Sequence, residues 1–309
     1  MTFPRTAGAL REALEARGIR PRRRHGQNFL TDPQAVDAIV RDAGVVPGDF
    51  VVEVGTGPGL LTHALCEAGA RVLSFDIDAD LQRLARSLRA WPARVRFETG
   101  DVLAGKHALA PRFAAAFDPA DAGDTPIKLV SNLPYSAATP ILMGVLSLPR
   151  PPDRFVVMVQ EEVGEKMLAP AGQHDYGAPS IAVALKARGR IVRRFGPAVF
   201  WPRPKVRSVV LDLAPLQPGL LSQEEHAPFG YFLIALFTRR RKVLTTALRT
   251  ALPGLTADDA RAALAAEGLD PRVRAEAVEP ARLLALWRRL APNAADTPAR
   301  PDRGGGETL

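Results

Sequence analysis

Short apolar runs alternate with helical segments from residue 50 onwards, and this alternation limits the chain to few folds. Runs of strand character recur seven times, and segments of roughly ten residues with helical character lie between most of them. Such alternation favours a parallel sheet with helices on both faces. The strands are expected at residues 50–54, 71–75, 94–98, 127–131, 154–160, 190–195 and 206–213.

The last two strands follow each other without a clear helix, so they are expected to form an antiparallel pair at one edge of the sheet. A doubly wound sheet that closes on a hairpin resembles the methyltransferase version of the nucleotide-binding fold. The fold class predicted is α/β, a Rossmann-like class I methyltransferase sheet of seven strands with a small C-terminal all-α domain. The helices of that domain are expected near 223–237, 239–251, 256–267 and 280–290.

These patterns divide the chain into a basic segment at 1–25, an α/β domain at 26–214, a helical domain at 215–291 and a tail at 292–309. The basic segment contains a short amphipathic helix at 6–17. The tail has several Pro and Gly residues and little apolar content, so it is expected to be disordered.

Another helix is expected directly after Asp32, which is a suitable N-cap. Pro33 suits the first turn of this helix, and Gly44 lies past its end. One buried stripe would be formed by Val36, Ile39 and Val40.

The composition favours an anionic partner. With 41 Lys and Arg residues against 33 Asp and Glu residues, the net charge is +8, which suits nucleic acid or an acidic membrane face. Cys66 is the only cysteine, so an internal disulfide and a cysteine-based zinc site are excluded. The sequence shows no secretory signal and no apolar run long enough to cross a bilayer, so a cytoplasmic protein is expected.

A glycine-rich loop, Glu53-Val-Gly-Thr-Gly-Pro-Gly59, follows the first strand of the sheet. Its glycines allow a tight turn and the close approach of a ligand, with the next helix opening at Leu60. A dinucleotide site is the obvious alternative, but its fingerprint needs a glycine where this chain has Thr62. The spacing is similar to that of the loop that holds S-adenosylmethionine in Rossmann-like methyltransferases.

Acidic residues end the next two strands, Asp76 after the second and Asp101 after the third. At such a position Asp76 can accept hydrogen bonds from both hydroxyls of a ribose. Asp101 can accept a hydrogen bond from an adenine amine. A carboxylate at a strand end is also often a helix N-cap. Because both acids follow a glycine loop, the pair favours a cofactor site.

The fourth strand ends in Asn132-Leu-Pro-Tyr135, at the crevice outside the carboxyl edge of the sheet. The Asn132 amide oxygen and a backbone carbonyl near Pro134 can accept hydrogen bonds from an exocyclic amine. The Tyr135 ring can stack on the base that carries this amine. The alternative is a plain strand and proline turn with Tyr135 half-buried.

With the glycine loop, both acids and Asn132-Leu-Pro-Tyr135 in this order, the chain resembles the ribosomal RNA adenine N6-dimethyltransferase family over roughly residues 20–250. The similarity is greatest to its small-subunit (16S) dimethyladenosine transferase branch. Further segments that fit are Gly26-Gln-Asn-Phe-Leu-Thr-Asp32, Met158-Val-Gln-Glu-Glu162, Asp175-Tyr-Gly177, Val199-Phe-Trp-Pro-Arg-Pro-Lys-Val-Arg-Ser208 and Leu236-Phe-Thr-Arg-Arg-Arg-Lys242.

The resemblance implies methyl transfer from S-adenosylmethionine to N6 of two adjacent adenosines in a loop near the 3′ end of 16S rRNA, during small-subunit biogenesis. It implies a monomer whose partner is 16S rRNA or the immature small ribosomal subunit, with no membrane partner and no metal. The RNA backbone would be bound by the helical domain and by two basic runs, Arg22 to Arg24 and Arg239 to Lys242.

The same resemblance assigns roles to single residues. The target adenine would be held by Asn132, Leu133, Pro134 and Tyr135, with Phe200 stacking on its other face. The cofactor would be contacted by Gln27, Asn28, Leu30, Gly55, Gly57, Gly59, Asp76, Asp101, Val102 and Asn132.

Several positions depart from the family pattern. Asp76 stands where the family commonly has Glu, so the carboxylate is one methylene shorter. Ser131 stands where glycine is common, and Ala137 and Ala138 stand where bulkier residues are expected. These changes affect the fit of ligands more than the chemistry.

Three other functions stay open. The large-subunit branch, which confers macrolide resistance, shares the chemistry, but the longer C-terminal domain and Arg239-Arg-Arg-Lys242 favour the small-subunit branch. A catalytically silent RNA-binding assembly factor has no need of the two acids and the Asn132 motif. A small-molecule methyltransferase has no need of the positive charge and the helical domain.

Overall fold

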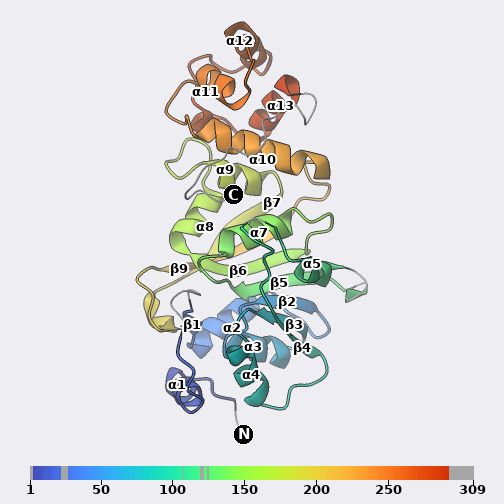
Figure 1. Ribbon diagram of the computed structural model, residues 1–309, viewed down its shortest axis with the longest axis vertical. Coiled ribbons are helices and arrows are strands. Elements are labelled where there is room, and N and C mark those ends of the chain that lie inside the picture. The colour runs from blue at the N-terminus through green and yellow to red at the C-terminus, as the bar shows by residue number, and fades with distance from the viewer. Residues whose placement is uncertain (1–2, 22–26, 107, 119–121, 124, 292–309) are drawn as a thin grey trace. The chain divides into compact units, whose positions relative to one another are not determined.

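The computed structural model describes residues 3–21, 27–106, 108–118, 122–123 and 125–291. The chain forms two compact units (Figure 1). The first contains Met1–Gly164 and Gly189–Pro215, and the second contains Glu165–Arg188 and Leu216–Leu309. The basic run at 22–24 and the tail at 292–309 lie outside the described residues.

A seven-stranded sheet with the order β4-β3-β2-β5-β6-β9-β7 forms the centre of the first unit (Figure 1). All seven predicted strands are confirmed, with ends that differ by at most three residues. They are β2 (Phe50–Val54), β3 (Arg71–Asp76), β4 (Val95–Thr99), β5 (Ile127–Asn132), β6 (Arg154–Gln160), β7 (Ala187–Phe195) and β9 (Ser208–Pro215).

Strands β2 to β6 are parallel, since β2 pairs in parallel with both β3 and β5, and the pairs β3 with β4 and β5 with β6 are parallel as well. β9 pairs antiparallel with β6 and lies beside β7. The Leu216 N–H donates to the Lys186 carbonyl at 2.8 Å, so the end of β9 meets the start of β7, as in the predicted antiparallel pair. The strand order reverses between β2 and β5, where sheets of this kind bind ligands.

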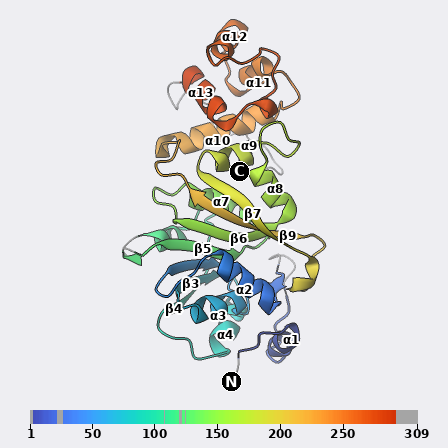
Figure 2. The same ribbon diagram turned by 180° about the vertical axis from the view of Figure 1, so that it is seen from behind.

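Helices cover both faces of the sheet. Four helices cover one face and share a core with residues of the strands such as Val72. They are α1 (Ala7–Glu15), α2 (Pro33–Asp42), α3 (Leu60–Glu67) and α4 (Ala79–Ser87). Phe75 faces the other way along β3, and its ring lies 5.2 Å from that of Phe113 in α5 (Pro111–Ala114). α7 (Ala138–Leu146) lies in front of the sheet in Figure 1, and α2 lies in front of it in Figure 2.

The N-terminal helix α1 belongs to the first unit, whereas the sequence treated residues 1–25 as a segment of their own. Leu10 and Leu14 are fully buried in the core, and the Arg11 guanidinium lies 5.4 Å from the centroid of the Trp201 ring. The amphipathic helix predicted at 6–17 is confirmed, and its apolar stripe is covered by the core of the first unit.

Helix α2 begins as predicted. The Asp32 side chain accepts a hydrogen bond from the Ala35 N–H at 2.9 Å, and Pro33 is the first helical residue. The helix ends before Gly44, whose φ is 55°. Of the predicted stripe, Val36 and Ile39 are buried and Val40 is half-buried.

Short elements complete the first unit. β1 (Phe29–Leu30) pairs antiparallel with β8 (Phe200–Trp201), with Leu30 opposite Phe200. The 3-10 turns η2 (Ala115–Phe117) and η3 (Pro197–Val199) precede β5 and β8. Helix α8 (Glu161–Leu168) follows β6, and the boundary between the two units falls within it, after Gly164.

The second unit has its own apolar core. It contains α9 (Ala178–Ala184), α10 (Gln223–Phe237), α11 (Leu244–Ala251), α12 (Ala257–Ala266), η4 (Ala275–Ala277) and α13 (Pro280–Leu290). The four helices predicted for this domain are α10 to α13, and they lie where they were predicted except that α11 begins at Leu244 rather than at 239. The residues at 239–242 are four consecutive cations with no apolar side chain to bury, so they form the turn before the helix.

Residues 165–188 join this helical unit, whereas the sequence placed them in the domain at 26–214. Tyr176, Ile181 and Leu185 lie in the helical core. The Tyr176 O–H donates to the Val278 carbonyl at 2.7 Å, and burial raises the pKa of this phenol. Sequence periodicity identifies an apolar helix face without showing which of two cores will receive it, so this correction required the structure.

Ser131 provides a test of how β5 is held beside β2. The backbone ladder between these strands extends to Val52 and Leu129, and beyond it the Val54 N–H donates to the Ser131 Oγ at 2.8 Å. Ser131→Ala leaves this buried N–H without an acceptor and should lower the free energy of unfolding by ~1–3 kcal/mol. Chemical denaturation measures the loss. Ser136→Ala, at an exposed position, is the control, and equal stabilities of the two variants would contradict the role of Ser131.

Candidate active site

A pocket opens at the carboxyl ends of β2, β3 and β5, where the strand order reverses. Nine of the residues predicted for the site line it together: Gln27, Asn28, Gly55, Gly57, Asp76, Asn132, Leu133, Pro134 and Tyr135. The segments that supply them are far apart in the sequence, and the parallel pairing of the three strands brings them to one edge.

The glycine loop approaches the end of β5 closely. Gly55 has a φ of 85°, and a Cβ there would lie 3.3 Å from the Asn132 carbonyl oxygen. Gly57 has a φ of 51°, and a Cβ there would lie 3.2 Å from the Phe29 ring. Glycine is therefore required at both positions by backbone conformation, and a side chain would also crowd the pocket.

Asp76 is nearly buried and binds backbone on both sides of the pocket. Its Oδ2 accepts a hydrogen bond from the Gly57 N–H at 2.7 Å, and its Oδ1 accepts one from the Asp78 N–H at 2.8 Å. Asp78 caps α4 and also accepts a hydrogen bond from the Gln27 Nε2 at 3.1 Å, which ties the entry segment to the strand end.

Asn132 offers an acceptor to the pocket. Its Nδ2 donates to the Asn28 carbonyl at 3.4 Å, while its Oδ1 is buried and has no hydrogen-bond partner among the described residues. Beside it the Tyr135 hydroxyl lies 2.8 Å from the Ser208 Oγ. Burial raises the pKa of Tyr135, so the phenol is neutral at physiological pH.

Five predicted residues do not line this pocket. Gly59 begins α3 and lies against α4, where a Cβ would be 3.3 Å from that of Ala85. The exposed Asp101 accepts a hydrogen bond from the Leu103 N–H at 2.9 Å, and Val102 is buried. Leu30 and Phe200 face each other in the β1–β8 ladder, and Phe200 is only 2% exposed, so its ring offers no free face for stacking.

The pocket also contains Phe29, Ile77 and Leu81, which sequence analysis did not select. Ile77 is 50% exposed, which is unusual for a large apolar side chain and suits contact with a flat ring. Its position between the acids Asp76 and Asp78 could have identified it, because an apolar residue there has no obvious core to enter.

Glu53 lies beneath the glycine loop in a buried polar network. Its Oε2 accepts hydrogen bonds from the Thr62 hydroxyl at 2.5 Å and the Ser74 hydroxyl at 2.6 Å. Burial, together with the nearby charge of Asp76, outweighs these bonds and raises the pKa of Glu53 to about 8. Glu53 is therefore largely protonated at neutral pH and adds little negative charge beneath the loop.

The described residues contain no group of three or more His, Cys, Asp and Glu side chains that could hold a metal ion. No helix in the described part of the chain is long and apolar enough to cross a membrane.

The family model described as ribosomal RNA adenine dimethylase matches residues 18–291. The chain belongs to this family. It is 37% identical over 286 residues to ribosomal RNA small subunit methyltransferase A of Moorella thermoacetica, covering 92% of this chain and 98% of that protein. It is 38% identical over 284 residues to the protein of the same name from an Anaeromyxobacter species, covering 91% and 97%.

Solved structures agree with the fold of the dimethylase family. A dimethyladenosine transferase from Plasmodium falciparum matches with a TM-score of 0.70 at 22% identity, covering 87% of this chain and 99% of that one. The 23S rRNA methyltransferase ErmE matches with a TM-score of 0.61 at 24% identity, covering 85% and 99%. At these identities the likeness shows the fold alone, which confirms the predicted Rossmann-like sheet.

The protonation of Glu53 gives a prediction for stability against pH. The pKa of Glu53 in the folded state lies above the unfolded value of 4.5. Its contribution to the free energy of unfolding is therefore full below pH 4.5 and is lost as the pH rises towards 8. Glu53→Gln, which cannot ionise, should gain stability relative to wild type over this window by at most ~1.4 kcal/mol per pH unit. Denaturation at several pH values tests this, with exposed Glu12→Gln as control. If wild type and Glu53→Gln differ in free energy of unfolding by the same amount at every pH, the pKa of Glu53 is not raised.

Proposed function

We propose that this protein transfers methyl groups from S-adenosylmethionine to N6 of two adjacent adenosines in a loop near the 3′ end of 16S rRNA, within the immature small ribosomal subunit. Its family and the shared name of its relatives support the reaction and the subunit. In the structure, the observation that carries the proposal is the buried, unpartnered Asn132 Oδ1. The enzyme is proposed to act as a cytoplasmic monomer.

The residues of the pocket suit the cofactor chemically. Gly55 and Gly57 leave the backbone open to a close ligand, and Asp76 places a carboxylate in the pocket lining, where it can accept from ribose hydroxyls. Ile77 adds an apolar surface for a purine. The pocket has a volume of only about 80 Å³, below the size typical of nucleotide-sized ligand sites, and Phe29, which lines it, lies against Gly57. Binding therefore requires residues 27–30 to move outwards.

When bound, S-adenosylmethionine supplies an electrophilic methyl group on a sulfonium. Asn132 would act on the other reactant, since its Oδ1 can accept a hydrogen bond from the adenine N6 amine. A backbone carbonyl at Leu133 or Pro134 would accept the second hydrogen. These acceptors turn the nitrogen lone pair, otherwise delocalised into the ring, towards the methyl group, a positioning effect worth several kcal/mol.

Tyr135 would stack on the target base, and its orientation is fixed by the hydrogen bond with Ser208. The base must be unpaired or flipped out, because N6 is inside a duplex otherwise. Phe200 would complete the stack only after its ring turns out of the β1–β8 ladder. No general base is required, since the proton can leave to solvent after transfer.

The helical unit is proposed to bind the RNA backbone. Arg239, Arg241 and Lys242 are exposed in the turn before α11, and no ion pair is recorded for them among the described residues. Unpaired cations of this kind attract phosphates and make binding depend on salt. Arg240 is different, because its guanidinium lies 4.0 Å from the Glu276 carboxylate.

Variants at the Asn132 motif test the mechanism. Asn132→Ala and Tyr135→Ala should keep the folded structure and lower methyl transfer by about a hundredfold or more, because each loses an interaction that positions the amine. Transfer of labelled methyl groups is the readout, and thermal unfolding verifies the fold. Gln173→Ala, exposed in the second unit, should keep full activity. A Tyr135→Ala or Asn132→Ala variant with wild-type activity would remove the role assigned here.

Undermethylated small and large ribosomal subunits test the substrate. Labelled methyl groups should appear only in the small-subunit RNA, as N6,N6-dimethyladenosine after nucleoside analysis. Label in the large-subunit RNA would favour the large-subunit branch instead. Tight RNA binding without any label would indicate an assembly factor that has lost catalysis.

A further inference from the structure

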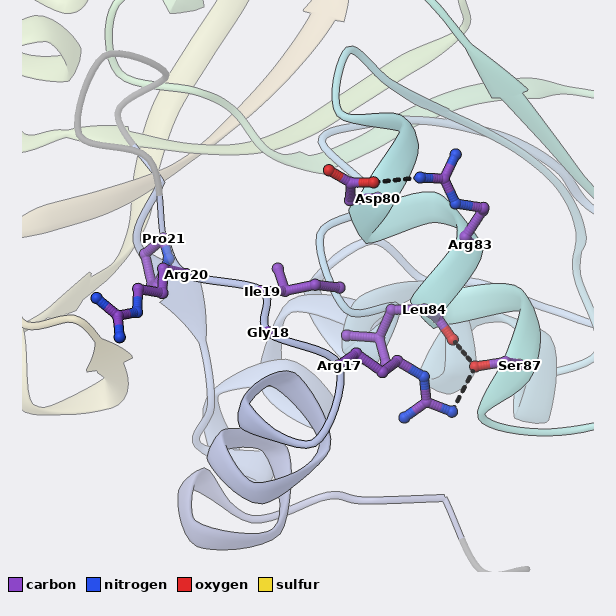
Figure 3. Close-up of a pocket in the computed structure, with 9 residues that line it drawn as sticks. All are labelled: Arg17, Gly18, Ile19, Arg20, Pro21, Asp80, Arg83, Leu84 and Ser87. Carbon is purple, nitrogen blue, oxygen red and sulfur yellow. Dashed lines mark hydrogen bonds and ion pairs between the residues drawn. The ribbon is translucent and has the colours of Figure 1, made fainter.

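A second pocket lies outside the catalytic one, between the segment that follows α1 and one side of α4 (Figure 3). Its volume is about 660 Å³, which is within the range of small-ligand sites. One wall is formed by Arg17, Gly18, Ile19, Arg20 and Pro21, and the other by Asp80, Arg83, Leu84 and Ser87.

The lining combines positive charge with an apolar centre. Three arginines face one aspartate, and Figure 3 shows Ile19 between Arg20 on one side and Arg83 on the other. Leu84 contributes its apolar side chain from α4. An arginine rim around an apolar centre suits a nucleotide, because the guanidinium groups can bind a phosphate while the base contacts the apolar side chains.

The arginines differ in how they are held. Arg17 donates to the Ser87 Oγ at 3.0 Å and to the Ala13 carbonyl at 3.3 Å, so its position is set without neutralising its charge. Arg83 forms an ion pair with Asp80. Arg20 is exposed, and no ion pair is recorded for it among the described residues. Figure 3 shows the guanidinium groups of Arg17 and Arg20 on opposite sides of Ile19, so each can meet a different phosphate of one strand, and no ion pair with a carboxylate of the described residues is found for either.

Both pockets are lined in part by residues of α4, so they lie close to each other. Leu81 lines the catalytic pocket and Leu84 lines the arginine pocket, and these residues are three positions apart on one helix, about 4.5 Å along its axis. We propose that the arginine pocket binds two phosphodiesters of the RNA strand that flanks the target adenosine, one at Arg17 and one at Arg20. This inference rests on the proposed function for the identity of the strand.

Charge variants in the full-length protein test the proposal. The double variant Arg17→Gln with Arg20→Gln should bind a labelled single-stranded RNA oligonucleotide with unpaired adenosines roughly tenfold more weakly at low salt, because two phosphate contacts are lost. The slope of log affinity against log salt should become shallower by about 1.4. Asp80→Asn removes the one negative charge of the lining and should tighten binding.

The control is Arg41→Gln with Arg150→Gln, which removes the same charge from exposed positions outside both pockets. A pocket variant that matches this control in affinity and salt slope, or an Asp80→Asn variant that binds no tighter, would overturn the proposal. If the wild-type protein binds RNA without transferring methyl groups, the proposed function fails, while the comparison of affinities still decides the role of the arginine pocket.

Discussion

The close approach of the Gly55 loop to the end of β5 determines the geometry of the catalytic pocket. β2 and β5 are parallel neighbours, so the loops that follow them leave the same edge of the sheet and must share one crevice. A Cβ at Gly55 would lie 3.3 Å from the Asn132 carbonyl, so only glycine, at a φ of 85°, allows the two loops to lie this close. A side chain there would push the Asn132 motif away from any ligand held by the loop.

Two carboxyl groups that differ in protonation support this loop. Asp76 binds the Gly57 N–H and keeps the loop against β3, while Glu53 binds two hydroxyls beneath it. Burial raises the pKa of Glu53 to about 8, so the pair carries roughly one negative charge at neutral pH rather than two. A single carboxylate near the crevice suits a positively charged sulfonium cofactor, and a second would add repulsion between the two acids without a cation to offset it.

Sequence patterns predicted the sheet almost completely because strand and helix periodicities differ and the central strands β2, β5 and β6 are strongly apolar. They also predicted which loops meet, since the carboxyl ends of parallel strands share one edge. They did not show that Phe200 is buried or that Gly59 serves helix packing, because both depend on contacts between distant segments. The sequence patterns also did not show that residues 165–188 belong to the helical core, because this too depends on contacts between distant segments. Motif identity locates a residue in the chain, whereas the orientation of its side chain is decided by packing.

In the proposed mechanism, the entry segment at 27–30 would connect cofactor binding with the orientation of Asn132. The Asn132 Nδ2 faces the Asn28 carbonyl at 3.4 Å, and the reversed amide would set two acceptor oxygens against each other, so Oδ1 stays available as an acceptor in the pocket. The Phe29 ring lies against Gly57, so residues 27–30 would have to shift to admit a nucleotide-sized ligand. The Asn28 carbonyl would orient the Asn132 amide again once the segment covers that ligand. Cofactor binding and recognition of the base would thus be coupled through this one hydrogen bond.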